Sequence, residues 1–114
     1  MPLYRLGSIK GEEVNPLTIR RYINGERMTL AQFMFKRGAK VRKHAHTNEQ
    51  FSIVLTGRLR FRINNEEYIA EAGDVVHVPP NIEHEVEALE DSTVIDVYSP
   101  IREDWIRGED KYLR

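Results

Sequence analysis

The sequence contains no cysteine and no long run of apolar residues. The first absence excludes disulfides, thiolate metal ligands and cysteine nucleophiles. The second excludes a membrane-spanning helix, which needs roughly 18 apolar residues in succession. The chain also lacks an excess of charge, because 17 Lys and Arg residues against 18 Asp and Glu residues give a formal net charge of -1. This balance gives no support for a nucleic-acid partner or for binding to a membrane surface.

The length and composition are those of a small globular protein. We interpret residues 1–114 as a single domain, because this length leaves no room for a second one. Hydrophobic residues make up 40% and charged residues 31%, which is enough for one core under a polar surface. The first residues do not follow the basic-then-apolar pattern of a signal peptide. We therefore expect a cytoplasmic protein.

Apolar and polar side chains alternate along most of the chain. Leu59, Phe61 and Ile63 alternate with arginines, and residues 82–88 carry glutamate at every second position. This period of two is typical of half-buried antiparallel strands. Short strands separated by turn signals roughly every 8 to 12 residues predict a β-sandwich or barrel. The alternation is lost from about Pro100, where we expect a turn or short helix that packs against the barrel.

Two of the predicted strands are apolar on both faces. These segments are residues 31–35 and 51–55. A strand covered on one side only would be polar on the other side. We therefore expect a second copy of the chain to cover the outer face, which predicts a homodimer. The alternative is that the chain's own C-terminal tail covers it.

Three of the four histidines have a spacing that suits a metal site. His44 and His46 are two residues apart, so on a strand they project from the same face with Cα atoms roughly 6 to 7 Å apart. Gln50 has the same parity, whereas Glu49 has the opposite parity and should point away. His84 lies in the middle of a predicted strand, on its apolar face. A lone interior histidine is usually structural, but three that converge with an amide oxygen predict a metal site.

The predicted donor set limits the choice of ion. Three imidazoles and an amide oxygen suit a divalent transition metal: Mn, Fe, Co, Ni or Zn. All four ligands are neutral, so the ion would keep most of its double positive charge. This favours a Lewis-acid role and the binding of an anionic oxygen, so we expect a small anionic substrate.

The same residues lie in two stretches that resemble the motifs of the cupin superfamily. Gly38–Gly57 has the spacing of the first motif, a glycine, His-x-His, a fourth ligand and a second glycine, with Gln50 where glutamate is usual. Gly73–His84 resembles the second motif, with Asn81 in place of a glycine, and the final asparagine of that motif is replaced by Ala88. The resemblance implies an all-β fold, the cupin double-stranded β-helix or jelly-roll barrel, here with a short C-terminal helical tail.

A narrower resemblance is to the KdgF-type cupins of pectin degradation. It rests on Gln50 together with the run Val94–Trp105. Those cupins act on 4,5-unsaturated uronate monosaccharides and speed conversion of the cyclic form to the open-chain keto form. The resemblance implies that Asp96, Tyr98 and Arg102 line the site, with tyrosine at a position where phenylalanine is expected.

Asp96 and Arg102 each have a catalytic interpretation and a structural one. Asp96 shares a strand face with Tyr98 and is the candidate general acid or base. The alternative is a structural carboxylate bonded to a turn or to an arginine. Arg102 could bind a substrate carboxylate with both arms of its guanidinium, or it could form a surface ion pair with Glu103 or Asp104.

The sequence therefore predicts a metal-dependent cupin enzyme that acts on a small sugar acid. Ring opening of 4,5-unsaturated uronates is the reaction that the narrower resemblance implies. Two alternatives stay open at this point. One is a cupin that binds a ligand without chemistry, and the other is a cupin dioxygenase or an isomerase of other small molecules.

Overall fold

Strands dominate the chain, as the alternating pattern predicts. The computed structural model describes residues 2–114. Within that range ten strands are joined by short turns, with brief helical segments near both ends of the chain. The strands are β1 (Glu12–Asn15), β2 (Thr18–Asn24), β3 (Thr29–Phe35), β4 (Lys40–His44), β5 (Glu49–Thr56), β6 (Arg58–Ile63), β7 (Glu66–Glu71), β8 (Val75–Val78), β9 (His84–Ala88) and β10 (Ser92–Ser99). The helical segments are the 3-10 helix η1 (Leu6–Ser8), the helix α1 (Glu103–Ile106) and the 3-10 helix η2 (Lys111–Leu113).

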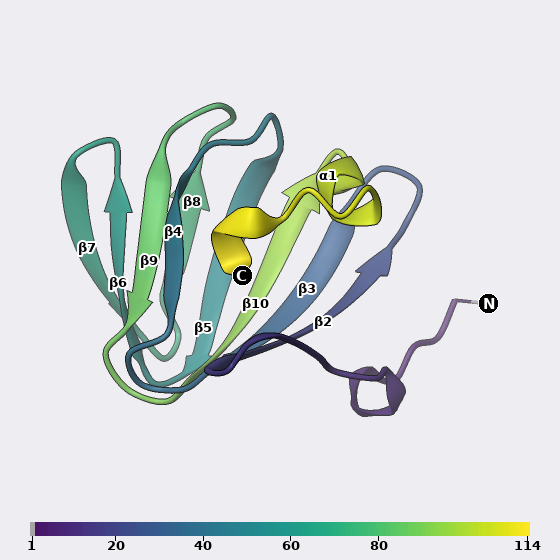
Figure 1. Ribbon diagram of the computed structural model, residues 1–114, viewed down its shortest axis with the longest axis horizontal. Helices are drawn as coiled ribbons and strands as arrows, with labels where there is room; N and C mark the ends of the chain where they lie inside the picture. The colour runs from purple at the N-terminus through teal and green to yellow at the C-terminus, as the bar shows by residue number, and fades with distance from the viewer. Residues whose placement is uncertain (1) are drawn as a thin grey trace.

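The strands form two antiparallel sheets that face each other (Figure 1). The larger sheet has the order β1-β2-β3-β10-β5-β8, and the smaller has the order β4-β9-β6-β7. β10 pairs with both β3 and β5, so segments far apart in the sequence are neighbours at the centre of the larger sheet. Two facing antiparallel sheets with this crossed order form a jelly roll. The predicted all-β fold class is thus confirmed.

The core lies between the two sheets. The inner face of β3 contributes Ala31, Phe33 and Phe35, and the smaller sheet contributes Leu59 and Phe61. These side chains are all buried, because successive residues of a strand point to opposite faces and the inner positions are apolar. Apolar side chains occupy many of the outer positions of the larger sheet as well.

The two segments that are apolar on both faces, residues 31–35 and 51–55, leave apolar side chains exposed on the outer face of the larger sheet. On β5, Ser52 and Val54 point inward, whereas Phe51 and Leu55 point outward and are 48% and 47% exposed. Met34 on β3 is also exposed on the outer face. The C-terminal tail does not cover this face, because it packs against the opposite side of the larger sheet.

Three turns depend on residues that tolerate the left-handed backbone conformation. Asn64 and Asn65 join β6 to β7 with φ angles of 48° and 72°. Asn81 has φ 64° in the turn before His84, so it takes the conformation that a glycine would. Gly57 has φ 89°, and a Cβ atom there would lie 2.1 Å from Oγ of Ser92. The bend between β5 and β6 therefore requires glycine.

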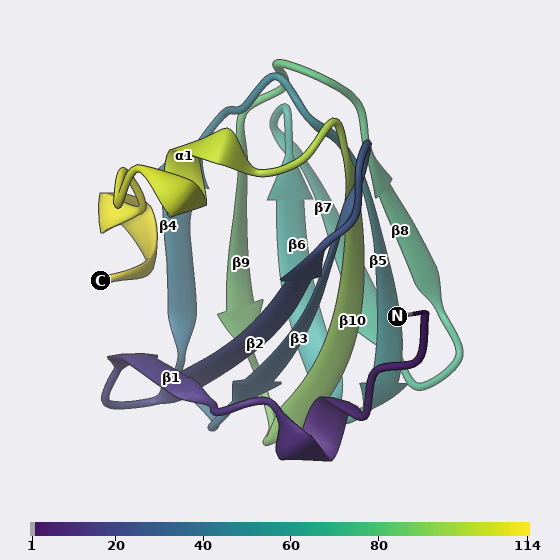
Figure 2. The same ribbon diagram turned by 90° about the vertical axis from the view of Figure 1, so that its right-hand side faces the viewer.

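The C-terminal tail lies over the open side of the barrel, between β4 and the larger sheet (Figures 1 and 2). Trp105 of α1 and Leu113 of η2 are buried in the core. The tail predicted to pack against the barrel does so. The helices in residues 2–114 are all too short to cross a membrane, and the cytoplasmic location stays a prediction.

Candidate metal centre

Three histidines meet at the mouth of the barrel, under the C-terminal tail. His44 ends β4, His46 lies in the loop that follows, and His84 begins β9. His44 and His84 are direct partners in the register of the smaller sheet. One ligand nitrogen from each of the three rings lies within 4.8 Å of the other two. The strand pairing thus brings together residues that are forty positions apart in the sequence.

Backbone carbonyls fix the orientation of all three rings. Nδ1 of His44 lies 2.7 Å from the carbonyl oxygen of Arg42. Nδ1 of His46 lies 3.0 Å from that of Asn48, and Nδ1 of His84 lies 2.8 Å from that of Ile82. A carbonyl only accepts a hydrogen bond, so each Nδ1 carries the proton. In the neutral ring Nε2 is then unprotonated and has a free lone pair, and this is the tautomer that binds a metal through Nε2.

Gln50 contributes a fourth donor at the same point. Its Oε1 lies 3.1 Å from Nε2 of His46, and its Nε2 donates to Oγ of Ser52 at 2.9 Å. The bond to Ser52 holds the amide oxygen on the side of the histidine. Because both facing atoms carry lone pairs, this close approach calls for a positive charge between or beside them, either a proton on the ring or a metal ion.

Burial of the rings argues against a proton on His46 and in favour of a metal ion, because it lowers the pKa of each histidine. Removal from water lowers the pKa of His44 to about 3, and the neighbouring His84 adds to this. Burial and then the charge of Arg102 lower the pKa of His46 to about 4, and burial also lowers the pKa of His84. The three rings are therefore neutral near pH 7, and their lone pairs fit a divalent transition metal. His44, His46, Gln50 and His84 would hold it.

Asp96 lies deeper in the barrel, on β10, opposite Ser52 of β5. It is 7% exposed, and the hydroxyl of Tyr98 donates to its Oδ2 at 2.7 Å. Burial raises the pKa of Asp96 to about 6, against the opposing effects of Ser52, Tyr98 and Arg102. Oδ1 has no hydrogen-bond partner among residues 2–114. A buried carboxyl group with one free oxygen and a pKa near neutrality is suited to proton transfer.

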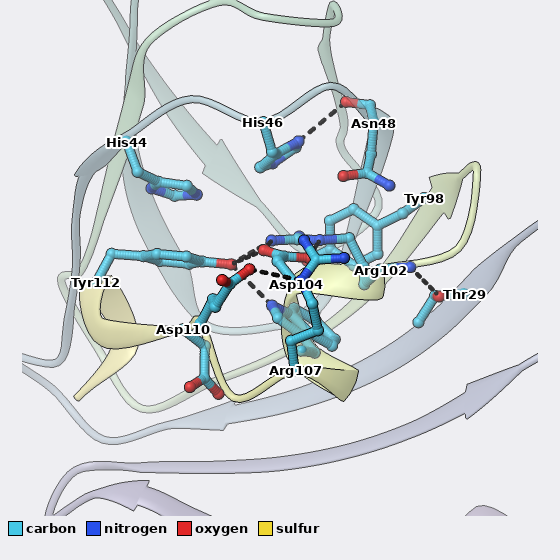
Figure 3. A network of polar contacts seen from close by, with 12 residues as sticks. Thr29, His44, His46, Asn48, Tyr98, Arg102, Asp104, Arg107, Asp110 and Tyr112 are labelled. Atoms are coloured by element: carbon cyan, nitrogen blue, oxygen red, sulfur yellow. Dashed lines mark hydrogen bonds and ion pairs between the residues drawn. The ribbon is translucent and has the colours of Figure 1, made fainter.

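Arg102 is buried beside these groups and is already paired. It is 1% exposed, and its Nε and Nη2 donate to the carboxylate of Asp104 at 3.0 and 2.8 Å (Figure 3). Its guanidinium lies over the rings of Tyr98 and Trp105, 4.5 and 4.4 Å from their centroids. Arg102 thus lines the site, and it also forms the ion pair with Asp104 that the sequence left open as an alternative.

A small cavity connects two of the histidines to the carboxyl group of Asp96. Its volume is about 30 Å³, and His44, His84, Asp96 and Arg102 are among its lining residues, with Gln50. Three further residues of the tail also line it, Trp105, Tyr112 and Leu113. Three of the four predicted metal ligands and the three predicted catalytic residues therefore line one cavity, whereas His46 lies outside its lining.

The sequence did not predict a site role for Tyr112. Its ring stacks on that of His44, with 3.9 Å between centroids and 8° between planes. No periodic pattern could place residue 112, since the tail beyond Pro100 does not alternate. The only available signal was the aromatic content of the tail, which predicted packing and not a role at the mouth of the site.

Glu49 lies outside the site, as its strand parity predicts. It is exposed on the outer face of β5, and its Oε2 lies 2.8 Å from Nε2 of the exposed His77. The better metal ligand by chemistry is thus excluded by geometry, and the amide at position 50 takes the inner position.

Comparison with known proteins connects this geometry to a family. A family model described as a cupin domain matches residues 31–98. An uncharacterized protein of Methanocaldococcus jannaschii is 30% identical over 84 residues, which are 73% of this chain and 64% of that protein. The chain thus spans somewhat less than two thirds of the length of this curated relative.

Solved structures give the same result for the fold. A structure of KdgF from Halomonas sp. is similar with a TM-score of 0.86 and 27% identity, covering 92% of this chain and 98% of that one. An RmlC-like cupin from Shewanella frigidimarina has a TM-score of 0.87 at 24% identity, covering 92% of this chain and 96% of the other. A predicted oxalate decarboxylase from Thermotoga maritima has a TM-score of 0.78 at 18% identity, covering 86% and 98%.

Proposed function

The chain belongs to the cupin family, and on that premise we propose that it is a metal-dependent enzyme acting on a small sugar acid. The reaction we favour is ring opening of 4,5-unsaturated uronates to the linear keto form, a step of pectin degradation. The observation that carries the proposal is the cavity that His44, His84 and the buried carboxyl group of Asp96 line together. The neutral His46 completes the histidine cluster beside it. The likeness to KdgF from Halomonas sp. supports the choice of substrate.

The predicted ligands suit a catalytic rather than a purely structural ion. A divalent metal bound by three imidazoles and one amide oxygen would supply a Lewis acid of nearly full double positive charge. The side chains that would hold it are neutral, so no ligand charge reduces its pull on a substrate oxygen. Such a centre favours a hydroxy acid or another anionic oxygen over a neutral molecule.

Asp96 is the group that would move a proton. Its Oδ2 accepts the hydroxyl hydrogen of Tyr98, so Oδ1 is the atom free to give or take one. With a pKa of about 6, both protonation states are populated near neutral pH. In the proposed reaction Asp96 delivers a proton to C4 of the unsaturated ring or activates water for attack at C5. The hydrogen bond from Tyr98 fixes the orientation of the carboxyl group of Asp96.

Arg102 would bind the carboxylate that every uronate carries. Its charge lies against the cavity, and Asp104 and the aromatic rings hold the guanidinium plane in a fixed orientation. A fixed guanidinium loses little freedom when it binds an anion. This role stays a prediction, since Asp104 takes two of its donor nitrogens in the present arrangement.

The test is direct turnover. Metal-analysed protein is incubated with 4,5-unsaturated galacturonate, and loss of the ultraviolet absorbance of the double bond is followed. We expect loss well above the spontaneous rate, and we expect Asp96→Asn to abolish it while the metal content is unchanged. His77→Asn, an exposed change outside the cavity, is the matched control.

Each other result has a definite meaning. No loss above the spontaneous rate with the metal bound would contradict the enzyme proposal. Tight binding of the uronate without product would favour a binding module, and iron-dependent oxygen uptake would favour a dioxygenase. Full activity in Asp96→Asn would remove this residue from its role.

We also propose that the chain forms a homodimer through the outer face of the larger sheet. The five strands of this sheet other than the short edge strand β1 lie about 4.8 Å apart and average about 7 residues, which gives a flat area of roughly 550 Å². Side chains make the accessible area of such a face larger than this flat area. It is then comparable to the ~800 Å² that each partner buries in a stable complex. The outer side chains are mostly apolar: Ile19, Met34, Phe51, Leu55 and Val75 are all exposed. An identical face on a second copy would bury them symmetrically.

The dimer is tested by mass in solution. Light scattering after size exclusion should give twice the chain mass for the wild type and the single mass for a Phe51→Glu, Leu55→Glu double variant. Tyr68→Glu changes an exposed aromatic on the smaller sheet and should leave the dimer intact. A wild-type protein of single mass at micromolar concentration would contradict the proposal.

A further inference from the structure

The cavity that holds Asp96 is too small for any sugar. Its volume is about 30 Å³ as measured for a water-sized sphere. A water molecule needs about 10–15 Å³ by this measure, so there is room for about two waters. A monosaccharide substrate, as the proposed function requires, must therefore displace part of the wall.

A larger cavity lies immediately outside. Its volume is about 450 Å³, and it is lined by His46 and its neighbours in the loop after β4, by Pro100 and Ile101, and by polar residues of the tail. Of the described residues, Tyr112 alone lines both this outer cavity and the inner one. Its side chain is therefore the partition between them.

The partition is held by specific contacts (Figure 3). The ring of Tyr112 lies parallel to that of His44. Its hydroxyl accepts hydrogen bonds from Nη2 of Arg102 and, at 2.7 Å, from Nε1 of Trp105. The hydroxyl donates to Oδ2 of Asp104 at 3.3 Å. All three bonds that a phenol can make are therefore used in the closed position.

The element that carries Tyr112 is the part of the wall best able to move. The remaining walls are mostly strands, whose ladders of backbone hydrogen bonds hold them in place. The segment η2 has three residues and is joined to the barrel by side-chain contacts. Asn15 donates to the carbonyl of Leu113 at 2.7 Å, and Arg20 pairs with Asp110 at 3.1 Å. Its release breaks no strand pairing.

We propose that Tyr112 is a gate that decides the size of the molecule reaching Asp96, His44 and His84 in the inner cavity. This inference rests on the proposed function in assuming that a sugar acid enters the inner cavity. Release of the tail joins the two cavities. It also removes the phenol from Nη2 of Arg102, so opening frees a charged donor at the moment when the carboxylate of the substrate arrives.

The test compares two carboxylates of different size. Acetate and D-galacturonate are mixed with Co²⁺-loaded protein in a stopped-flow instrument, and association is followed by the cobalt absorption. In Tyr112→Ala we expect galacturonate to associate at least about tenfold faster than in the wild type, whereas acetate changes less than about twofold. Tyr68→Ala removes an exposed tyrosine far from the site and should match the wild type for both.

A second variant protects the test against misfolding. Asn15→Ala leaves every site residue in place. It removes the tie to the tail, together with the bond that Oδ1 accepts from the backbone N–H of Leu17 in the turn after β1, so galacturonate should associate at an intermediate rate. If Tyr112→Ala does not unfold cooperatively on heating, it is misfolded, and the galacturonate rate of Asn15→Ala then decides whether the tail controls access.

Several outcomes would overturn the gate. These are equal galacturonate rates in all variants, equal acceleration of both carboxylates, or no galacturonate binding even in Tyr112→Ala. The proposed function fails separately, because faster galacturonate association without turnover of the unsaturated uronate would leave the gate standing and remove the reaction.

Discussion

Replacing Asp96 by asparagine should stabilise the metal-free protein, by an amount that depends on pH. The carboxyl group ionises near 3.8 in the unfolded chain and near 6 in the folded one, because the fold removes it from water. Between these values the folded state keeps a proton that the unfolded state has lost. Raising the pH therefore favours unfolding of the wild type, and asparagine removes this effect.

The magnitude follows from the two pKa values. A difference of about two units at 1.36 kcal/mol per unit gives about 3 kcal/mol. Well below pH 3.8, wild type and Asp96→Asn should differ only by a constant that reflects their hydrogen bonds. From pH 4 to pH 6 the variant should gain about 1 kcal/mol per pH unit on the wild type, and above pH 7 the gain should be constant.

The assay is urea unfolding followed by the fluorescence of Trp105, the single tryptophan of the chain. Protein treated with EDTA is used at one fixed concentration, since both a bound metal and a dimer would change the apparent stability. Glu83→Gln, at an exposed position, is the control and should show no such trend. A flat difference between wild type and Asp96→Asn from pH 4 to pH 7 would refute the argument that burial dominates at Asp96. A difference that grows as the pH falls would refute it as well.

Three other changes test the site and the fold. His84→Ala should lower metal affinity roughly 100-fold or more, measured as metal retained per chain after dialysis, with the far-ultraviolet circular dichroism unchanged; full retention would remove His84 from the ligand set. Gln50→Glu should retain the metal but lower kcat, because a charged ligand weakens the Lewis acid, and an unchanged kcat would argue against that role. Gly57→Ala should lower the free energy of unfolding by about 3 kcal/mol, since the new Cβ would meet Oγ of Ser92 at 2.1 Å. Gly73→Ala, with φ 94° but no described atom within 4 Å of the new Cβ, should cost only about 1 kcal/mol, and equal losses at both glycines would show that backbone strain and not the clash decides.

The grouping of the candidate ligands could be predicted because it depends on local rules. His44 and His46 are two apart, Gln50 keeps their parity, and His84 lies on the apolar face of an alternating strand. The same rule placed Asp96 and Tyr98 together on the inner face of β10. Strand parity is set by the backbone, so it survives without any knowledge of the partner strands.

The direction in which the two faces of β5 point could not be predicted from the local sequence pattern. On β5 the larger side chains, Phe51 and Leu55, point outward, and the smaller Ser52 and Val54 point inward. Hydrophobicity alone would favour the reverse, but the strand has one parity, and the position of Gln50 at the site fixes it.

The partner of Arg102 could not be predicted either. Glu103 and Asp104 are both within reach in the sequence, and the short helix α1 decides between them by turning Asp104 back toward the guanidinium. Tyr112 is beyond prediction for a related reason, because its contact with His44 is made by a segment without any periodic pattern.

The position of β10 has a consequence for how the protein is made. This strand leaves the ribosome after the nine other described strands, yet it lies between β3 and β5 and pairs with both. Until residues 92–99 emerge, those two strands have unpaired edges that can recruit other chains. Synthesis that stalls before this point would therefore yield an aggregation-prone chain without Asp96, so we expect nascent chains of this length to depend on chaperones.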